Sequence, residues 1–221
     1  MASEILSFNT ANGGTTAFVA SPDAPTSKAV IIIHEWWGLN DHIRDIAGRY
    51  SEEGFLAIAP DLYRGRLATT SDEAGALMNG LAIEDGLDTI SNAIGAASEQ
   101  FGISHFGITG FCMGGTFSLR AACEVEGLSA CAAFYGDLPL EDILQTLTVP
   151  TLFISGIRDA WINPEKVAQL EDIAERHELP VTSLKYEADH AFFNDTRPEV
   201  YNATAAADAW ALVTGFFNDK L

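Results

Sequence analysis

The sequence predicts an α/β fold, with a mostly parallel central sheet and helices on both faces. Three observations favour it. Short apolar runs alternate with segments of helical periodicity from residue 28 to the end of the chain. The first of these runs, Lys28–Ile33, is the kind of strand that is buried on both faces of a sheet. Before it, Ser3–Phe8 and Thr15–Ala20 flank Asn9–Gly14, whose Asn-Gly-Gly predicts an antiparallel hairpin at the amino end.

The remaining elements follow in order from apolar runs and from the residues that cap helices. Asn40 or Asp41 is a suitable N-cap for the first helix, and Asn163 followed by Pro164 begins a later one. The further strands are expected at Phe55–Ala59, His105–Gly110, Ala130–Tyr135, Thr151–Ser155 and Val181–Tyr186. Helices are expected at Asn40–Glu53, Ser71–Met78, Glu84–Gln100, Cys112–Glu126, Leu138–Leu147, Pro164–His177 and Pro198–Phe217.

The chain of 221 residues, 48% of them hydrophobic, is long enough to bury the core of one α/β domain spanning 1–221. No linker, repeat or low-complexity tract divides it. No apolar stretch approaches the roughly 20 residues that span a membrane. The first residues lack the basic and apolar regions of a secretory leader, so we expect a cytoplasmic protein.

The formal net charge of −19 argues against binding to nucleic acid or to an anionic membrane. The acidic residues are spread along the chain and identify no partner, although they fit adaptation to high salt. The three cysteines form no C-x-x-C pair and no Cys/His cluster with metal spacing. We therefore expect free thiols in a reducing compartment, and neither a metal nor an organic cofactor.

The most informative motif is Gly110-Phe111-Cys112-Met113-Gly114-Gly115, which has the pattern G-x-C-x-G. This is a nucleophile elbow, a sharp strand-to-helix turn, with cysteine in the place where serine usually stands. A cysteine there predicts a hydrolase that works through a thiolate. The amino end of the following helix favours that ionised form, because its free N–H groups carry partial positive charge.

A base and an acid follow the elbow in the order typical of such hydrolases. His190 follows the last predicted strand, where it can accept the proton of Cys112 and later activate water. Asp159 follows an earlier strand and can orient the imidazole of His190. Asp137 also follows a strand and is the main rival for this role, whereas Asp189 is too close in sequence to orient its neighbour easily.

Together with the elbow, several other segments make the chain similar to one known family over nearly its whole length. They are His34-Glu35-Trp36-Trp37-Gly38, Pro60-Asp61-Leu62-Tyr63, Asp159 and His190-Ala191-Phe192. The chain resembles the dienelactone hydrolases, a cysteine-using branch of the α/β-hydrolases. The resemblance implies the α/β-hydrolase fold, a small ester or lactone as the substrate, and catalysis without a cofactor.

The resemblance also gives Glu35 a role. In the family this glutamate lies near the cysteine, which implies that Cys112 rests partly protonated until ligand binding rearranges Glu35 to receive the thiol proton. Like-charge repulsion would raise both pKa values. The alternative is a structural glutamate paired with Arg44 or Arg66.

Two backbone N–H groups are expected to form an oxyanion hole, that of Met113 after the nucleophile and, by resemblance, that of Trp36. The expected substrate-binding residues are Tyr63, Arg64, Arg66, Tyr135, Phe192 and Asn194. Family members that hydrolyse dienelactone carry an arginine four residues beyond the catalytic histidine. Here that position is Asn194, which cannot replace a charged clamp, although Arg197 lies nearby.

The sequence therefore predicts a cysteine-dependent hydrolase of small esters or lactones that is a monomer or a weak homo-oligomer. A broad-specificity carboxylesterase or thioesterase on the same triad is the alternative, and selectivity for carboxylate-bearing substrates separates the two. A non-catalytic binding protein would keep the pocket but form no thioester.

Overall fold

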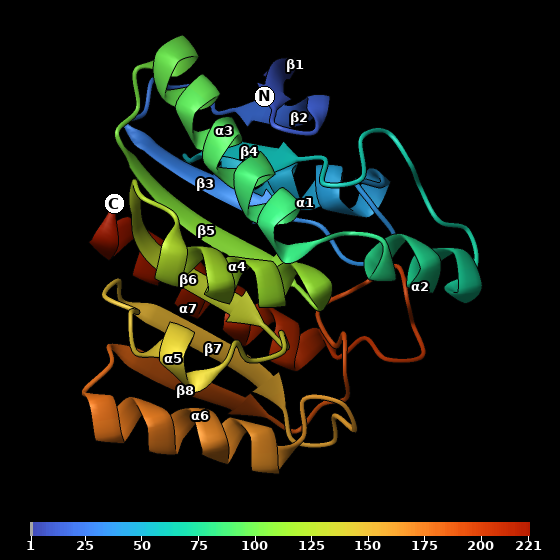
Figure 1. The fold of residues 1–221 in the computed structure, drawn as a ribbon, viewed down its shortest axis with the longest axis vertical. Helices are drawn as coiled ribbons and strands as arrows, with labels where there is room; N and C mark the ends of the chain where they lie inside the picture. Colours follow the sequence, from blue (N-terminus) through green and yellow to red (C-terminus); the bar gives the residue numbers. More distant parts are fainter. Residues whose placement is uncertain (1) are drawn as a thin grey trace.

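The structure is a computed structural model and describes residues 2–221 (Figure 1). Eight strands form one sheet in the order β1-β2-β4-β3-β5-β6-β7-β8. The strands are β1 (Ala2–Thr10), β2 (Gly13–Ser21), β3 (Lys28–Ile33), β4 (Leu56–Pro60), β5 (His105–Phe111), β6 (Leu128–Phe134), β7 (Thr151–Gly156) and β8 (Val181–Tyr186).

The expected mostly parallel sheet with an antiparallel hairpin is confirmed. From β4 through β3, β5, β6 and β7 to β8, all neighbouring strands are parallel. The hairpin of β1 and β2 joins the edge of this sheet, because β2 pairs antiparallel with β4. The carboxyl ends of the parallel strands consequently lie along the same edge of the sheet, where binding sites of α/β proteins form.

Helices cover both faces of the sheet. In Figure 1, α3, α4 and α5 lie in front of it, and α1 and α7 lie behind. The helices are α1 (Asp41–Glu52), α2 (Ser71–Asn79), α3 (Ile83–Phe101), α4 (Met113–Glu124), α5 (Glu141–Leu144), α6 (Pro164–His177) and α7 (Ala203–Lys220). The predicted caps are confirmed: the Asn40 side chain accepts from the N–H of Ile43, and that of Asn163 from the N–H of Lys166. Within residues 2–221, no helix is long and apolar enough to cross a bilayer.

Two predicted helices differ most from the observed ones in their bounds. The closing helix begins at Ala203 and not at Pro198, because Asn202 caps it by accepting from the N–H of Ala205. Residues before this cap form turns, which matters because they lie beside the candidate site. Helix α5 is limited to a single turn, Glu141–Leu144.

Glycines let the backbone of α4 approach the strands closely. A Cβ atom on Gly114 would lie 2.2 Å from the carbonyl oxygen of Ile33 in β3. A Cβ atom on Gly110 would lie 2.2 Å from the carbonyl oxygen of Gly114. Real Cβ atoms do not approach backbone this closely, so side chains at either position would push α4 away from the sheet.

The first prediction concerns this contact. We expect Gly114→Ala to lower the free energy of unfolding by about 1–3 kcal/mol or more, because the methyl group overlaps backbone that cannot move aside. Gly95→Ala in α3 is the matched control. A Cβ atom there meets nothing within 4 Å, so the change should be neutral or stabilising by up to about 1 kcal/mol. Urea unfolding measures both, and equal effects would contradict the close-contact argument.

Candidate active site

The elbow holds Cys112 in a strained conformation between β5 and α4. Its φ is 56° and its ψ is −116°, a combination that non-glycine residues rarely adopt. Two backbone hydrogen bonds hold it there. The N–H of Cys112 donates to the carbonyl oxygen of Phe134 at 3.1 Å, and its own carbonyl accepts from the N–H of Thr116 at 3.1 Å. The backbone of the turn therefore determines where the sulfur lies.

The thiol of Cys112 is buried and resists ionisation. Cys112 is only 8% exposed to solvent. Burial, followed by the negative charge of Glu35, raises the pKa of Cys112 to about 12. The N–H of Met113 favours the thiolate, as expected at the start of a helix, but is outweighed. This pKa favours the protonated thiol at neutral pH.

His190 and Asp159 form a hydrogen-bonded pair beside this thiol. Nδ1 of His190 lies 2.6 Å from Oδ2 of Asp159, so Nδ1 carries the proton and Nε2 is the acceptor of the neutral ring. Nε2 is buried and has no hydrogen-bond partner. Oδ1 of Asp159 accepts from the N–H groups of Trp161 and Ile162, at 2.8 and 2.9 Å.

The charge state of Asp159 follows from these contacts. Burial opposes ionisation of its carboxyl, but the hydrogen bond and charge of His190, together with the two N–H donors, outweigh it. The pKa of Asp159 is consequently held below its usual value. A carboxylate in this position fixes the tautomer and the orientation of the imidazole.

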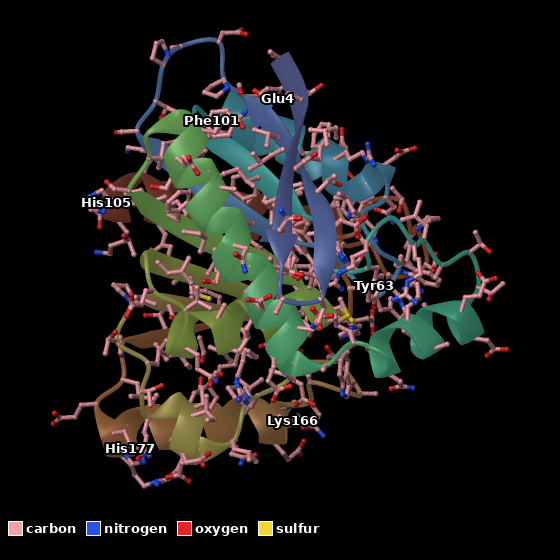
Figure 2. The ribbon with its side chains drawn as sticks, turned by 45° about the horizontal axis from the view of Figure 1, so that its top comes forward. Glu4, Tyr63, Phe101, His105, Lys166 and His177 are labelled. Carbon is pink, nitrogen blue, oxygen red and sulfur yellow. The ribbon has the colours of Figure 1, made fainter. Side chains whose placement is uncertain are left out.

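The two rival aspartates have other partners. Asp137 pairs with Nζ of Lys166 at 2.5 Å. Lys166 lies in the first turn of α6 and is labelled in Figure 2. Asp189 lies 3.4 Å from the guanidinium of Arg158 and is half-exposed. Of the three candidates, only Asp159 contacts the imidazole of His190.

Glu35 is a buried carboxyl with one side-chain hydrogen bond. It follows β3, is 2% exposed, and its Oε2 accepts from Nδ2 of Asn194 at 2.7 Å. Burial raises the pKa of Glu35 to about 7, although the Asn194 donor and the charges of Arg197 and His190 oppose the shift. Neither Arg44 nor Arg66, the alternative partners considered from the sequence, holds this carboxyl.

His34 supports the loop that carries Glu35. Its Nδ1 lies 2.7 Å from the carbonyl oxygen of Glu35, and its Nε2 accepts from the N–H of Leu62 at 3.2 Å. Each ring nitrogen therefore has a backbone partner. His34 joins the loops after β3 and β4 and is structural.

One cavity of about 300 Å³ brings the candidate groups together. Its walls are mostly apolar and aromatic. Glu35, Trp36, Trp37, Met78, Cys112, Trp161, His190, Ala191 and Arg197 line it. Met78 comes from α2 and was not predicted, since nothing in the local pattern of that helix points to a site. Within residues 2–221, no group of three or more His, Cys, Asp or Glu side chains could hold a metal ion.

The six residues expected to bind substrate are not among those that line this cavity. Tyr63, Tyr135 and Phe192 are fully buried, and the hydroxyl of Tyr63 donates to Sδ of Met113 at 3.0 Å. The ring of Tyr135 packs edge-on against the imidazole of His190, with centroids 5.1 Å apart. These side chains support the site from beneath. Asn194 is also buried, and its amide is used on Glu35.

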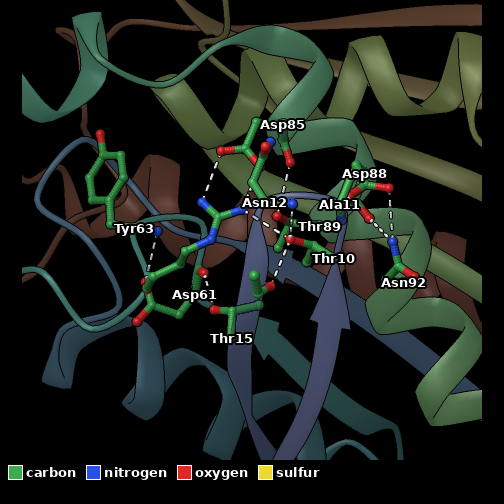
Figure 3. Close-up of polar contacts among 12 residues, drawn as sticks. Thr10, Ala11, Asn12, Thr15, Asp61, Tyr63, Asp85, Asp88, Thr89 and Asn92 are labelled. Atoms are coloured by element: carbon green, nitrogen blue, oxygen red, sulfur yellow. Dashed lines mark hydrogen bonds and ion pairs between the residues drawn. The ribbon is translucent and has the colours of Figure 1, made fainter.

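Neither of the two arginines in the loop after β4 lines the cavity. The guanidinium of Arg64 pairs with Asp85 and donates to Oγ1 of Thr10 at 3.1 Å. Figure 3 shows Asp85, Thr10 and Asn12 gathered at the tip of the β1–β2 hairpin. Nε of Arg66 donates to the carbonyl oxygen of Tyr63 at 3.2 Å. The arginine that does line the cavity is Arg197.

The strand order, the crossover helices and the elbow at the carboxyl edge define an α/β-hydrolase. A crystal structure of a "Putative Dienelactone Hydrolase" from Klebsiella pneumoniae superposes on this chain with a TM-score of 0.90 at 28% identity. The superposition covers 98% of each chain.

The chain belongs to the dienelactone hydrolase family, whose model matches residues 15–221. It is 36% identical over 205 residues to Protein usf of Aquifex pyrophilus, covering 87% of this chain and 88% of that protein. It is 32% identical over 216 residues to a "Putative carboxymethylenebutenolidase" of Aquifex aeolicus, covering 92% and 93%. The protein is thus a hydrolase of the ester and lactone type.

The second prediction separates the two aspartates that follow strands. We expect Asp159→Asn to lower kcat for an aryl ester by about 10³–10⁴-fold, because the amide presents the wrong partner to Nδ1 of His190. Asp137→Asn is the matched control and should leave kcat nearly unchanged, since Asp137 pairs with Lys166. Steady-state kinetics test both, and a greater loss in the Asp137 variant would reverse the assignment.

Proposed function

We propose that Cys112, His190 and Asp159 act as a catalytic triad that hydrolyses small esters or lactones through a thioester. One observation carries the proposal. One cavity is lined by the thiol of Cys112 and by His190, whose buried Nε2 has no partner and whose Nδ1 is hydrogen-bonded to the carboxylate of Asp159. This set of groups has the roles of nucleophile, base and orienting acid.

In the first half-reaction the thiol of Cys112 gives its proton to Glu35, and the sulfur attacks the carbonyl carbon. The carbonyl oxygen becomes negative and accepts hydrogen bonds from the N–H groups of Trp36 and Met113. The intermediate then collapses. The bond from carbon to the leaving oxygen breaks, that oxygen takes the proton from Glu35, and a thioester remains on Cys112. For a lactone, the freed hydroxyl stays attached to the acyl group.

In the second half-reaction Nε2 of His190 takes a proton from water, and the resulting hydroxide attacks the thioester. Asp159 stabilises the imidazolium and keeps the ring oriented. The carbon–sulfur bond breaks, the carboxylic acid leaves, and His190 returns the proton to the sulfur of Cys112. The cycle ends with the thiol in the protonated state that its pKa of about 12 favours.

The cavity suits a small and flat substrate. The indole of Trp36 packs edge-on against that of Trp37, and the indole of Trp161 lies 5.2 Å from the His190 ring. Arg197 is the single Arg or Lys among the described residues that line the cavity. A lactone or ester with a carboxylate placed to reach Arg197 fits these walls.

The broad-specificity carboxylesterase remains a second candidate, because the cavity offers one arginine and not a pair. Arg64 is paired with Asp85, and Asn194 is neutral and bonded to Glu35. Arg197 itself is paired with Glu199 at 2.8 Å and must leave this partner to bind an anion. The same triad would then act on neutral esters with little selectivity.

The third prediction tests the nucleophile. We expect Cys112→Ala to lower kcat for aryl esters by about 10³-fold or more, and complete alkylation of Cys112 by iodoacetamide to do the same. Cys123→Ala is the matched control, because Cys123 is a second free thiol that does not line the cavity. Activity that survives complete modification of Cys112, verified by mass spectrometry, would contradict the mechanism.

The fourth prediction tests the substrate class. We expect Arg197→Gln to raise KM for a carboxylate-bearing lactone by about tenfold, which corresponds to loss of a charge-assisted hydrogen bond. KM for a neutral aryl ester should change little. Arg158→Gln is the control, since Arg158 is half-exposed and pairs with Asp189 outside the cavity. An equal change for charged and neutral substrates would favour the broad-specificity esterase.

A further inference from the structure

The positive charge that lines the cavity already has a partner in the chain. Nε of Arg197 donates to Oε1 of Glu199 at 2.8 Å, and Nη2 of Arg197 lies 2.8 Å from the same oxygen. Nε and Nη2 form one edge of the guanidinium, and such an edge can bind a carboxylate through two parallel hydrogen bonds. Glu199 therefore occupies donors that a substrate carboxylate would use.

Glu199 is a carboxylate at neutral pH, and water has access to it. Its own backbone N–H, followed by the hydrogen bond and the charge of Arg197, holds the pKa of Glu199 below its usual value. The side chain of Glu199 is 58% exposed, so water can hydrate the carboxylate when it leaves Arg197. Exposed ion pairs are weak, because hydration and side-chain entropy compete with them. A carboxylate that belongs to a substrate can consequently displace Glu199.

Backbone hydrogen bonds hold Arg197 independently of its side chain. The N–H of Arg197 donates to the carbonyl oxygen of Asn194 at 3.1 Å. The carbonyl oxygen of Arg197 accepts from the N–H groups of Val200 and Tyr201, at 3.1 and 3.0 Å. The guanidinium can therefore change partners by side-chain rotation, without rearrangement of the turn.

We propose that Glu199 is a specificity-determining residue, which competes with the carboxylate of an anionic ester or lactone for the guanidinium of Arg197. The inference rests on the proposed function, in which Arg197 binds that carboxylate. Only the molecules in which Glu199 has released Arg197 can bind the anion, so the apparent KM rises by the inverse of their fraction. A neutral ester makes no use of Arg197, and its KM is independent of Glu199.

Two other roles of Glu199 give different results. If its charge only repels anionic substrates through space, removing that charge should lower their KM whether or not Arg197 is present. If Glu199 instead orients the guanidinium toward the cavity, removing it should raise their KM. Competition alone gives a lower KM that requires Arg197.

The test compares mono-para-nitrophenyl adipate with para-nitrophenyl hexanoate by steady-state kinetics. The two esters share a leaving group and the length of the acyl chain, and only the adipate carries a terminal carboxylate. We expect Glu199→Gln to lower KM for the adipate by about two- to sixfold, the range that release of an exposed ion pair gives. KM for the hexanoate should not change. In the Arg197→Gln background, Glu199→Gln should have no effect on either substrate.

Glu187→Gln is the matched control. It removes the same charge from a side chain that is 81% exposed, pairs with Arg158 and does not line the cavity, so KM for the adipate should stay as it is. An unchanged or higher KM in Glu199→Gln, or an equal decrease with and without Arg197, would overturn the competition.

Failure of the proposed function gives a different pattern. If Arg197→Gln alone leaves KM for the adipate unchanged, Arg197 does not bind the carboxylate, and both the substrate class and the competition are wrong. If the competition alone is wrong, Arg197→Gln still raises this KM. Failure of the triad would be seen separately, as ester turnover that survives full alkylation of Cys112.

Discussion

The arrangement of the site depends on the contact between the first turn of α4 and the strands β3 and β5. Gly110 and Gly114 bring backbone against backbone there, at distances that exclude a side chain. This contact places Cys112 at the carboxyl edge of the sheet, in a conformation that its neighbours hold against strain. The loops after β3, β7 and β8 lie at the same edge of the sheet. They carry Glu35, Asp159 and His190 toward the sulfur.

Burial raises the pKa of each acidic group gathered at this edge, but the net shifts go in opposite directions. Asp159 is held as a carboxylate because an imidazole and two N–H groups compensate for its burial. For Cys112 and Glu35 the compensation is smaller than the effect of burial, and the negative charge of Glu35 further disfavours the thiolate of Cys112. The same low-dielectric environment therefore keeps one carboxyl ionised and the thiol protonated. The difference comes from the number of donors that each group finds, and not from its depth alone.

Local pattern was sufficient to predict the strands, the hairpin, the helix caps and the elbow, because each depends on neighbours in sequence. The choice between Asp159 and Asp137 was not decided by position, since both follow strands. The pairing of β7 with β8 places His190 in hydrogen-bond contact with Asp159, whereas Lys166 of α6 pairs with Asp137. Only the tertiary arrangement contains that information.

The substrate-binding residues were the least predictable part, because the direction of a loop side chain depends on remote segments. Arg64 is drawn to Asp85 of α3 and Thr10 of the hairpin, neither of which the loop sequence specifies. From the sequence, Asn194 was a poor substitute for an arginine that binds a substrate carboxylate. Its contact with Glu35 requires the loop after β3 to lie beside the turns before α7, which the sequence does not show. The late start of α7, set by its N-cap Asn202, leaves room for those turns.

The protonated and buried state of Cys112 also affects how the protein withstands oxidants. Peroxide attacks thiolates in accessible positions, whereas the raised pKa and the burial of Cys112 disfavour both ionisation and access. Peroxide does not oxidise a serine hydroxyl in this way, so a cysteine in this elbow is open to an oxidation that a serine would avoid. In the proposed cycle, retaining the proton on sulfur limits this risk to the steps in which the thiolate forms.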